Sequence, residues 1–198
     1  MLIKPNRTLS ALILASLVGL GAAVTLSVLP AAAVPAGMEP KEGAAAEVDP
    51  NSALARGGDP ERGKTVFQNV GHCVECHGWG GDGTGSNPRS PGAAANLRET
   101  QLDTDALLEV IACGIPGTPM PYHLSSAYKS YECYGGMKLE DFGEGEGPHK
   151  GKTFREKDVL NVVAFIQQHF QPLAGTKPDL AECEAFFKPG SRNCAGLK

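Results

Sequence analysis

The segment Cys73-Val74-Glu75-Cys76-His77 constrains this chain more than any other feature. Two cysteines three positions apart lie on one side of a helical turn, so both thiols can reach the same edge of a flat macrocycle. The adjacent histidine then comes under the centre of that ring. This spacing is typical of covalent haem c attachment, in which the thiols bond the two vinyl groups and the histidine binds the iron.

Three other interpretations of this motif are weaker. A thioredoxin-like redox pair requires a preceding strand and an alternating β/α chain, and neither pattern is visible. A zinc site requires a second closely spaced pair of ligands, and Cys113 and Cys133 are too far apart to provide one. A plain disulfide between Cys73 and Cys76 leaves His77 unexplained. No second Cys-x-x-Cys-His occurs in the chain, so the sequence predicts one covalent haem c.

The composition leaves the polypeptide with a thin core of its own. Aromatic residues make up only 6% of the chain, and 25 Gly and 15 Pro are spread over 198 residues. A small, loop-rich domain of this kind needs disulfides, a metal or a cofactor for stability. A buried macrocycle would supply the missing apolar mass.

The N-terminal region predicts export. Residues 1–33 have the layout of a signal peptide, with Lys4 and Arg7 before an uncharged stretch and a small-x-small cleavage pattern after it. That stretch is also long enough, at about 20 residues, to be an uncleaved membrane anchor. We therefore expect a periplasmic location, with membrane attachment only if the segment is uncleaved. Residues 34–58 are rich in Ala, Pro, Glu and Gly, which predicts a flexible linker.

Three helices are predicted from capping residues and apolar periodicity. The first begins at Asp59, with Pro60 at the first helical position. The second runs from Asp103 to Gly114, and the third begins with a capping box at 153–156. Their apolar faces are Val66, Phe67 and Val70; Leu107, Val110 and Ile111; and Val159, Val163, Ile166 and Phe170. No alternating strand pattern is visible.

The second axial ligand of the iron is predicted in a proline-stiffened loop. Met120 lies between Pro119 and Pro121, where an extended main chain can present a thioether without a large ordering cost. Met137 follows two glycines, and packing over a gap is its preferred interpretation. His123 would give a bis-histidine haem. We rank Met120 first, His123 second and Met137 third.

These features resemble the class I (mitochondrial-type) cytochromes c over residues 59–170. The resemblance is carried by a helix with Gly63 and Phe67, by Cys-x-x-Cys-His-Gly, and by a Pro-Met-Pro loop followed by an amphipathic helix. It implies an all-α fold in which about three helices and long loops wrap around one covalent haem. It also implies that Gly63 and Phe67 pack across the last helix near Val163 and Ile166.

The resemblance implies further haem contacts. The carbonyl of a loop proline should accept a hydrogen bond from His77; Pro91 is the expected residue and Pro88 the second choice. Leu97 should line the haem pocket. Independently of the resemblance, the position of Trp79 just after the haem motif predicts that it packs near the ring. For Arg98, pairing with a haem propionate and a surface position both remain open.

The chain also has segments that the family pattern does not require. Residues 121–152 form a long insertion within a domain expected at 59–172, and residues 173–198 form a C-terminal tail. The four remaining cysteines allow three pairings. We expect Cys113–Cys133, which would tie the Met120 loop to the insertion, and Cys183–Cys194, which would staple the tail.

The preferred hypothesis is a periplasmic one-electron carrier, not an enzyme, with His77 and Met120 filling both axial positions. Its partners would be an upstream dehydrogenase or quinol-oxidising complex and a downstream terminal oxidase. A net charge of −4 argues against nucleic acid as a partner. The alternative is a dedicated electron-accepting subunit of an exported dehydrogenase, for example a quinoprotein. A haem enzyme or gas sensor would require that Met120 does not bind iron.

Overall fold

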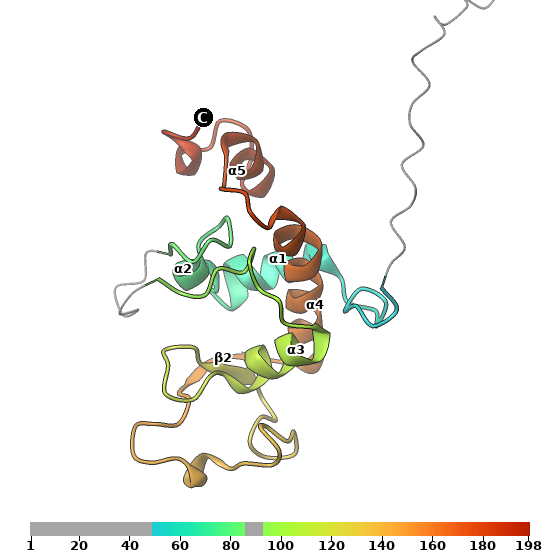
Figure 1. Ribbon diagram of the computed structural model, residues 1–198, viewed down its shortest axis with the longest axis vertical. Coiled ribbons are helices and arrows are strands. Elements are labelled where there is room, and N and C mark those ends of the chain that lie inside the picture. Colours follow the sequence, from blue (N-terminus) through green and yellow to red (C-terminus); the bar gives the residue numbers. More distant parts are fainter. Residues whose placement is uncertain (1–48, 86–92) are drawn as a thin grey trace, which may run out of the picture. The chain divides into compact units, whose positions relative to one another are not determined.

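A computed structural model describes residues 49–85 and 93–198, all within the compact unit 45–198 (Figure 1). The predicted signal peptide 1–33, most of the linker 34–58, and both Pro88 and Pro91 lie outside the described residues. Five α-helices, two strands and several single turns are described: α1 Pro60–Thr65, η1 Val66–Val70, α2 Val74–His77, α3 Thr104–Cys113, β1 Tyr122–Leu124, η2 Leu139–Asp141, β2 Lys150–Phe154, α4 Glu156–Phe165, η3 Ile166–Phe170, η4 Gln171–Leu173, α5 Leu180–Phe186 and η5 Arg192–Cys194. None of these helices combines the length and hydropathy needed to cross a membrane.

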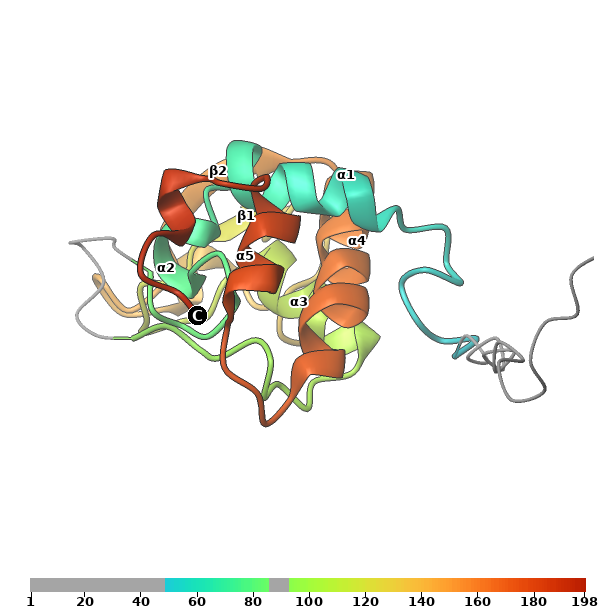
Figure 2. The same ribbon diagram turned by 90° about the horizontal axis from the view of Figure 1, so that it is seen from above.

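The helix α1 lies directly across α4 (Figure 2). Gly63 makes this contact, because a Cβ there would lie 1.9 Å from the main-chain oxygen of Asn161. The Phe67 ring packs between Phe165 and Phe170, with ring centroids 5.5 and 5.3 Å away. The crossing predicted for Gly63 and Phe67 near Val163 and Ile166 is therefore confirmed, with Asn161, Phe165 and Phe170 among their contacts.

The predicted capping residues start the first two helices. Asp59 caps α1 by accepting hydrogen bonds from the main-chain N–H groups of Glu61 and Arg62, and Asp103 caps α3 through Ala106. Both α1 and α4 continue into a π-helical turn.

The apolar stripe of α4 and η3 is buried along its whole length, as predicted. Val70, by contrast, is 44% exposed, so its assignment to an apolar face is wrong. The wider π-helical turn rotates it away from Val66, with which an α-helix would have aligned it.

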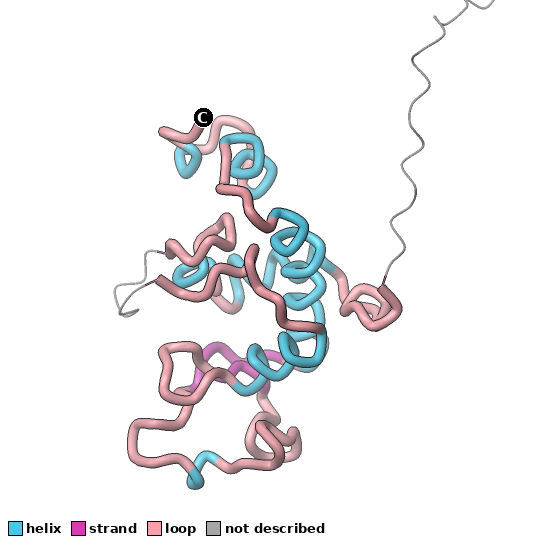
Figure 3. The backbone as a smooth tube through the Cα atoms, in the orientation of Figure 1, coloured by secondary structure: helices cyan, strands magenta, loops and turns pink. Residues whose placement is uncertain are grey.

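The third helix begins later than predicted. Thr153 belongs to β2, and the N-cap is Arg155, whose main-chain N–H donates to Asp158 at 3.0 Å. The strands β1 and β2 pair in parallel, with Tyr122 opposite Lys150 and an irregular register (Figure 3). The described structure is thus helix-rich with a small sheet rather than all-α. Strands of three and five residues are too short to show an alternating pattern in the sequence.

Both ends of the described unit pack on its core. Residues 49–58 form turns in which Ala53 is fully buried and donates its main-chain N–H to Gln167 at 2.9 Å. The predicted linker is therefore too long at its C-terminal end. The tail contains α5, and the buried Phe186 side chain lies 6.5 Å from Phe165 between ring centroids.

Candidate functional site

The Cys-x-x-Cys-His motif forms one helical turn, as predicted. Cys73 is the N-cap of α2, and its carbonyl accepts hydrogen bonds from the N–H groups of Cys76 at 3.1 Å and His77 at 2.9 Å. The turn brings both half-buried cysteines and the histidine together within residues 73–77. Burial raises the pKa of the Cys73 thiol to about 12, whereas redox-active Cys-x-x-Cys pairs have a lowered thiol pKa.

His77 has one ring nitrogen fixed and the other left for a ligand. Its Nδ1 lies 2.9 Å from the carbonyl oxygen of Ala95, and because a carbonyl only accepts, Nδ1 carries the proton. The unprotonated Nε2 is then available to a metal. Burial lowers the pKa of His77, which favours the neutral imidazole that metal ligation needs. Among the described residues the acceptor is therefore Ala95, whereas Pro91 and Pro88, expected in this role, lie outside the described residues.

The loop after the motif is tied back to α2 by main-chain hydrogen bonds. The N–H of Gly83 donates to His77 at 2.9 Å, and the N–H of Gly85 donates to Cys76 at 3.0 Å. Farther along, the N–H of Leu97 donates to Gly81 at 2.7 Å. Leu97 is buried in the hydrophobic core, so the predicted pocket residue is held by the same loop that follows His77.

Met120 is half-buried, packs against the hydrophobic core, and has a constrained main chain. Its N–H donates to Thr118 Oγ1 at 3.2 Å, and its carbonyl accepts from the N–H of Ile115 at 3.1 Å. Gly114 ends α3 with φ +69°, and a Cβ there would lie 2.8 Å from the Met120 carbonyl oxygen. The prolines flanking Met120 therefore belong to a loop that is closed by hydrogen bonds.

The two alternative candidates for the second iron ligand, His123 and Met137, lie in surroundings that differ from those of Met120. His123 is 5% exposed in β1, where its Nδ1 donates to the carbonyl of Lys152 at 2.9 Å and its ring stacks on Phe154 at 4.5 Å. Burial lowers its pKa. Met137 lies in a turn that bridges to Cys133.

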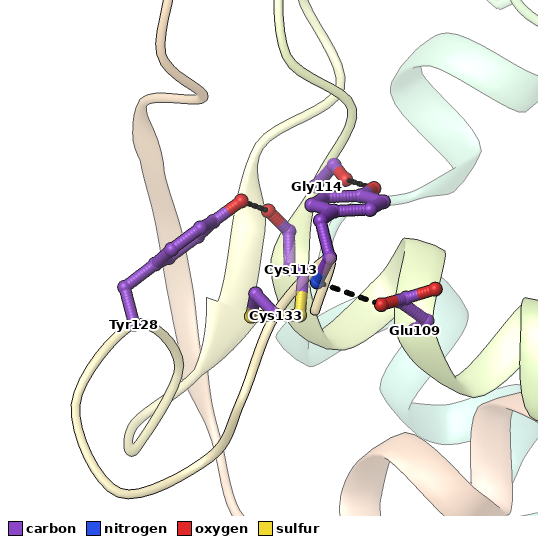
Figure 4. Close-up of a disulfide and its surroundings, with 6 residues drawn as sticks. Glu109, Cys113, Gly114, Tyr128 and Cys133 are labelled. Carbon is purple, nitrogen blue, oxygen red and sulfur yellow. Dashed lines mark hydrogen bonds between the residues drawn. A yellow bond between two sulfur atoms is a disulfide. The ribbon is translucent and has the colours of Figure 1, made fainter. Parts of the chain in front are cut away.

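Both expected disulfides, Cys113–Cys133 and Cys183–Cys194, are confirmed. The first joins the end of α3 to the insertion (Figure 4). The two thiols of the motif are not used by either bond.

Arg98 is buried rather than on the surface, with 1% of its area exposed. Its guanidinium forms a bidentate ion pair with Glu182 of α5, at 2.8 and 3.1 Å, and also bonds Gly80 and Thr176. The Nε atom is buried without a hydrogen-bond partner in the described part of the chain. Sequence reasoning missed Glu182, because no local pattern marks a partner 84 residues away.

Trp79 packs against α5 as well, with its ring 6.3 Å from Phe186 and 6.2 Å from Phe187. Its predicted position near a haem stays a prediction.

Two thiols and a neutral imidazole on one helical turn, followed by a loop that fixes the imidazole tautomer, define a c-type cytochrome. Consistent with this, the protein-family model for cytochrome c matches residues 60–170. The chain therefore belongs to the cytochrome c family, which carries covalently attached haem c and serves in electron transfer. The search of curated proteins and the search of solved structures gave no match. The tail, with α5, lies beyond the matched residues.

Proposed function

We propose that this protein is a periplasmic one-electron carrier with a single haem c bonded to Cys73 and Cys76 and with iron bound by His77 and Met120. When bound, the haem supplies an iron centre that cycles between the ferrous and ferric states. The observation that carries the proposal is the 2.9 Å contact from His77 Nδ1 to Ala95, which leaves Nε2 as the ligand atom on the turn that bears both thiols.

Other residues of the chain fit the same group. The unpartnered Nε of Arg98 is a buried donor that a carboxylate such as a haem propionate would satisfy. Leu97 is 8% exposed and would keep water from the ring. Met120 is favoured as second ligand because its loop is already ordered, so little conformational entropy is lost on binding.

Occupation of both axial positions by the chain favours electron transfer over ligand chemistry. With His77 and Met120 both bound to the iron, no position would be left for oxygen or peroxide. Ligation by Met and His also gives a higher potential than ligation by two histidines, so we place the protein toward the oxidising end of a respiratory chain.

The visible spectrum of the ferric protein tests the ligand set. The wild type should show the methionine–iron charge-transfer band, Met120→Ala should lack it, and the matched control Met137→Ala should retain it. Mass spectrometry of the purified protein should show one haem adduct on the peptide containing Cys73 and Cys76. A band that survives Met120→Ala would refute the assignment of the ligand.

A dedicated subunit of an exported dehydrogenase is the second candidate. It is favoured by the acidic segment 139–146, in which the side chain of Leu139 is 41% exposed. A complex that co-purifies in high salt would support this candidate, whereas weak binding that is lost as salt rises would support the diffusing carrier.

A further inference from the structure

We propose that the insertion at residues 121–152 is a clamp that holds the Met120 loop in its ligating position, with Tyr128 and Tyr134 as positioning residues. The clamp rests on the proposed function, because it takes Met120 as the second iron ligand. It assigns a role to a segment that the family resemblance leaves unexplained.

Three bonds from the insertion converge on two consecutive residues where the chain leaves α3 for the Met120 loop (Figure 4). The hydroxyl of Tyr128 donates to the carbonyl of Cys113 at 2.8 Å, and the hydroxyl of Tyr134 donates to the carbonyl of Gly114. The disulfide Cys113–Cys133 adds a covalent tie at the same point. Carbonyls at the end of a helix have no partner within the helix, so these hydroxyls satisfy acceptors that would otherwise need water.

The main-chain conformation of both tyrosines indicates that the structure holds their side chains in a fixed direction. Tyr128 and Tyr134 have φ angles of 59° and 49°, and they are two of the three non-glycine residues with positive φ in the described part of the chain. Bulky residues avoid this region, so the surrounding contacts must maintain it. For Tyr134 one such contact comes from α3 itself, where Glu109 Oε1 accepts from its main-chain N–H at 2.8 Å.

The insertion also holds the loop at two further points. The N–H of Gly117 donates to the carbonyl of Glu146 at 2.8 Å, before Met120. Directly after Met120 the chain enters the insertion itself, where the N–H of Tyr122 donates to the carbonyl of His149 at 3.0 Å and β1 begins to pair with β2. The chain is thus held by hydrogen bonds of the insertion on both sides of the methionine.

The contact between Gly114 and Met120 couples the clamp to the ligand. Their main chains are so close that a Cβ on Gly114 would lie 2.8 Å from the Met120 carbonyl oxygen. A main-chain movement that withdrew Met120 from an iron would shift Gly114 and displace its carbonyl from Tyr134. The clamp therefore opposes any displacement of the methionine that moves the main chain of the loop.

Competition by imidazole, which binds ferric haem in place of methionine, measures this coupling. The charge-transfer band of the ferric holoprotein is titrated with imidazole in Tyr128→Phe, Tyr134→Phe and the control Tyr131→Phe. Tyr131 is a half-buried residue of the same insertion whose hydroxyl makes no hydrogen bond within residues 49–85 and 93–198. Loss of one neutral hydrogen bond should tighten apparent imidazole binding about fivefold in each of the first two variants. The control should match the wild type.

The outcomes separate the clamp from the ligand assignment. A wild type without the charge-transfer band would overturn the proposed function and the clamp with it. If the band is present and all three variants bind imidazole as the wild type does, only the clamp is overturned, even if Tyr128→Phe or Tyr134→Phe lowers thermal stability. If Tyr134→Phe yields no holoprotein, the comparison of Tyr128→Phe with Tyr131→Phe decides.

Discussion

The ion pair between Arg98 and Glu182 should respond strongly to Glu182→Gln. The guanidinium of Arg98 is 1% exposed and is neutralised by the two carboxylate oxygens of Glu182 at 2.8 and 3.1 Å. The substitution keeps the shape of the side chain but removes the carboxylate bonded to Nη1 and Nη2, so the buried charge retains only the propionate proposed at Nε. Removal of one partner of a buried pair costs about 3–5 kcal/mol. Because 21% of the Glu182 side chain reaches solvent, we expect the lower end, about 3 kcal/mol.

Urea unfolding measures this effect. Far-UV circular dichroism follows the transition, because Trp79 lies three residues after Cys76 and a haem bonded there would quench its fluorescence in the folded and unfolded states alike. With a slope of about 2 kcal/mol per molar urea, a loss of about 3 kcal/mol lowers the midpoint by about 1.5 M. The double variant Arg98→Met, Glu182→Leu should recover most of the stability, because it removes both charges of the pair.

The chain supplies a matched control on its surface. Arg56 and Asp105 form a second ion pair between two distant segments, and the Asp105 side chain is 76% exposed. Solvent screens this pair, so Asp105→Asn should leave the urea midpoint unchanged. Equal, small shifts in Glu182→Gln and Asp105→Asn would refute the reasoning, since the charge on Arg98 would then be solvated despite its burial.

Three further predictions follow from the packing. Gly63→Ala places a Cβ 1.9 Å from the Asn161 oxygen, so it should force the helices apart and lower the free energy of unfolding in urea by about 3 kcal/mol; an unchanged midpoint would contradict this. Burial holds the pKa of His123 below 6.5 in the folded state, so the stability contributed by the neutral ring should be present above pH 6.5 and lost as the pH falls through the lower folded value. Thermal unfolding should show a shallower acid decline in His123→Gln, and an identical decline would exclude His123 as its source. Replacement of Cys183 and Cys194 by alanine opens a loop with a separation of 11 residues and should cost about 2–3 kcal/mol, with faster proteolysis of the tail; unchanged proteolysis would show that packing alone holds the tail.

Features with a local physical cause could be predicted from the sequence. Asp59 and Asp103 cap their helices because their side chains reach N–H groups two or three residues ahead. The turn at 73–77 follows from the spacing of its cysteines. The Cys113–Cys133 pairing could be predicted because a bond between these two residues ties the Met120 loop to the insertion that follows it.

Features that depend on distant contacts could not be predicted. Among the described residues the acceptor for His77 is Ala95, because the return of the loop, not residue type, decides which carbonyl comes near the ring. Any carbonyl can fill that role, so the sequence carries no mark of it. Two other contacts also join segments that are far apart in the sequence: the pairing of β1 with β2, and the ion pair between Arg98 and Glu182. Patterns of neighbouring residues do not indicate such contacts.

The insertion and the tail each support one of the two proposed iron ligands. The insertion bonds the main chain that leads to Met120, whereas the tail, through Glu182, bonds the segment that follows Ala95 and so supports the ring of His77. A carrier that changes oxidation state without changing ligands benefits when both ligands are held in place, because few atoms then have to move when an electron is transferred. The two supports should be separable in experiment. Glu182→Gln should weaken the tail contact without altering the affinity for imidazole, and Tyr134→Phe should raise that affinity without exposing Trp79. If each variant produced both effects, the two segments would form one cooperative unit rather than independent supports for the two ligands.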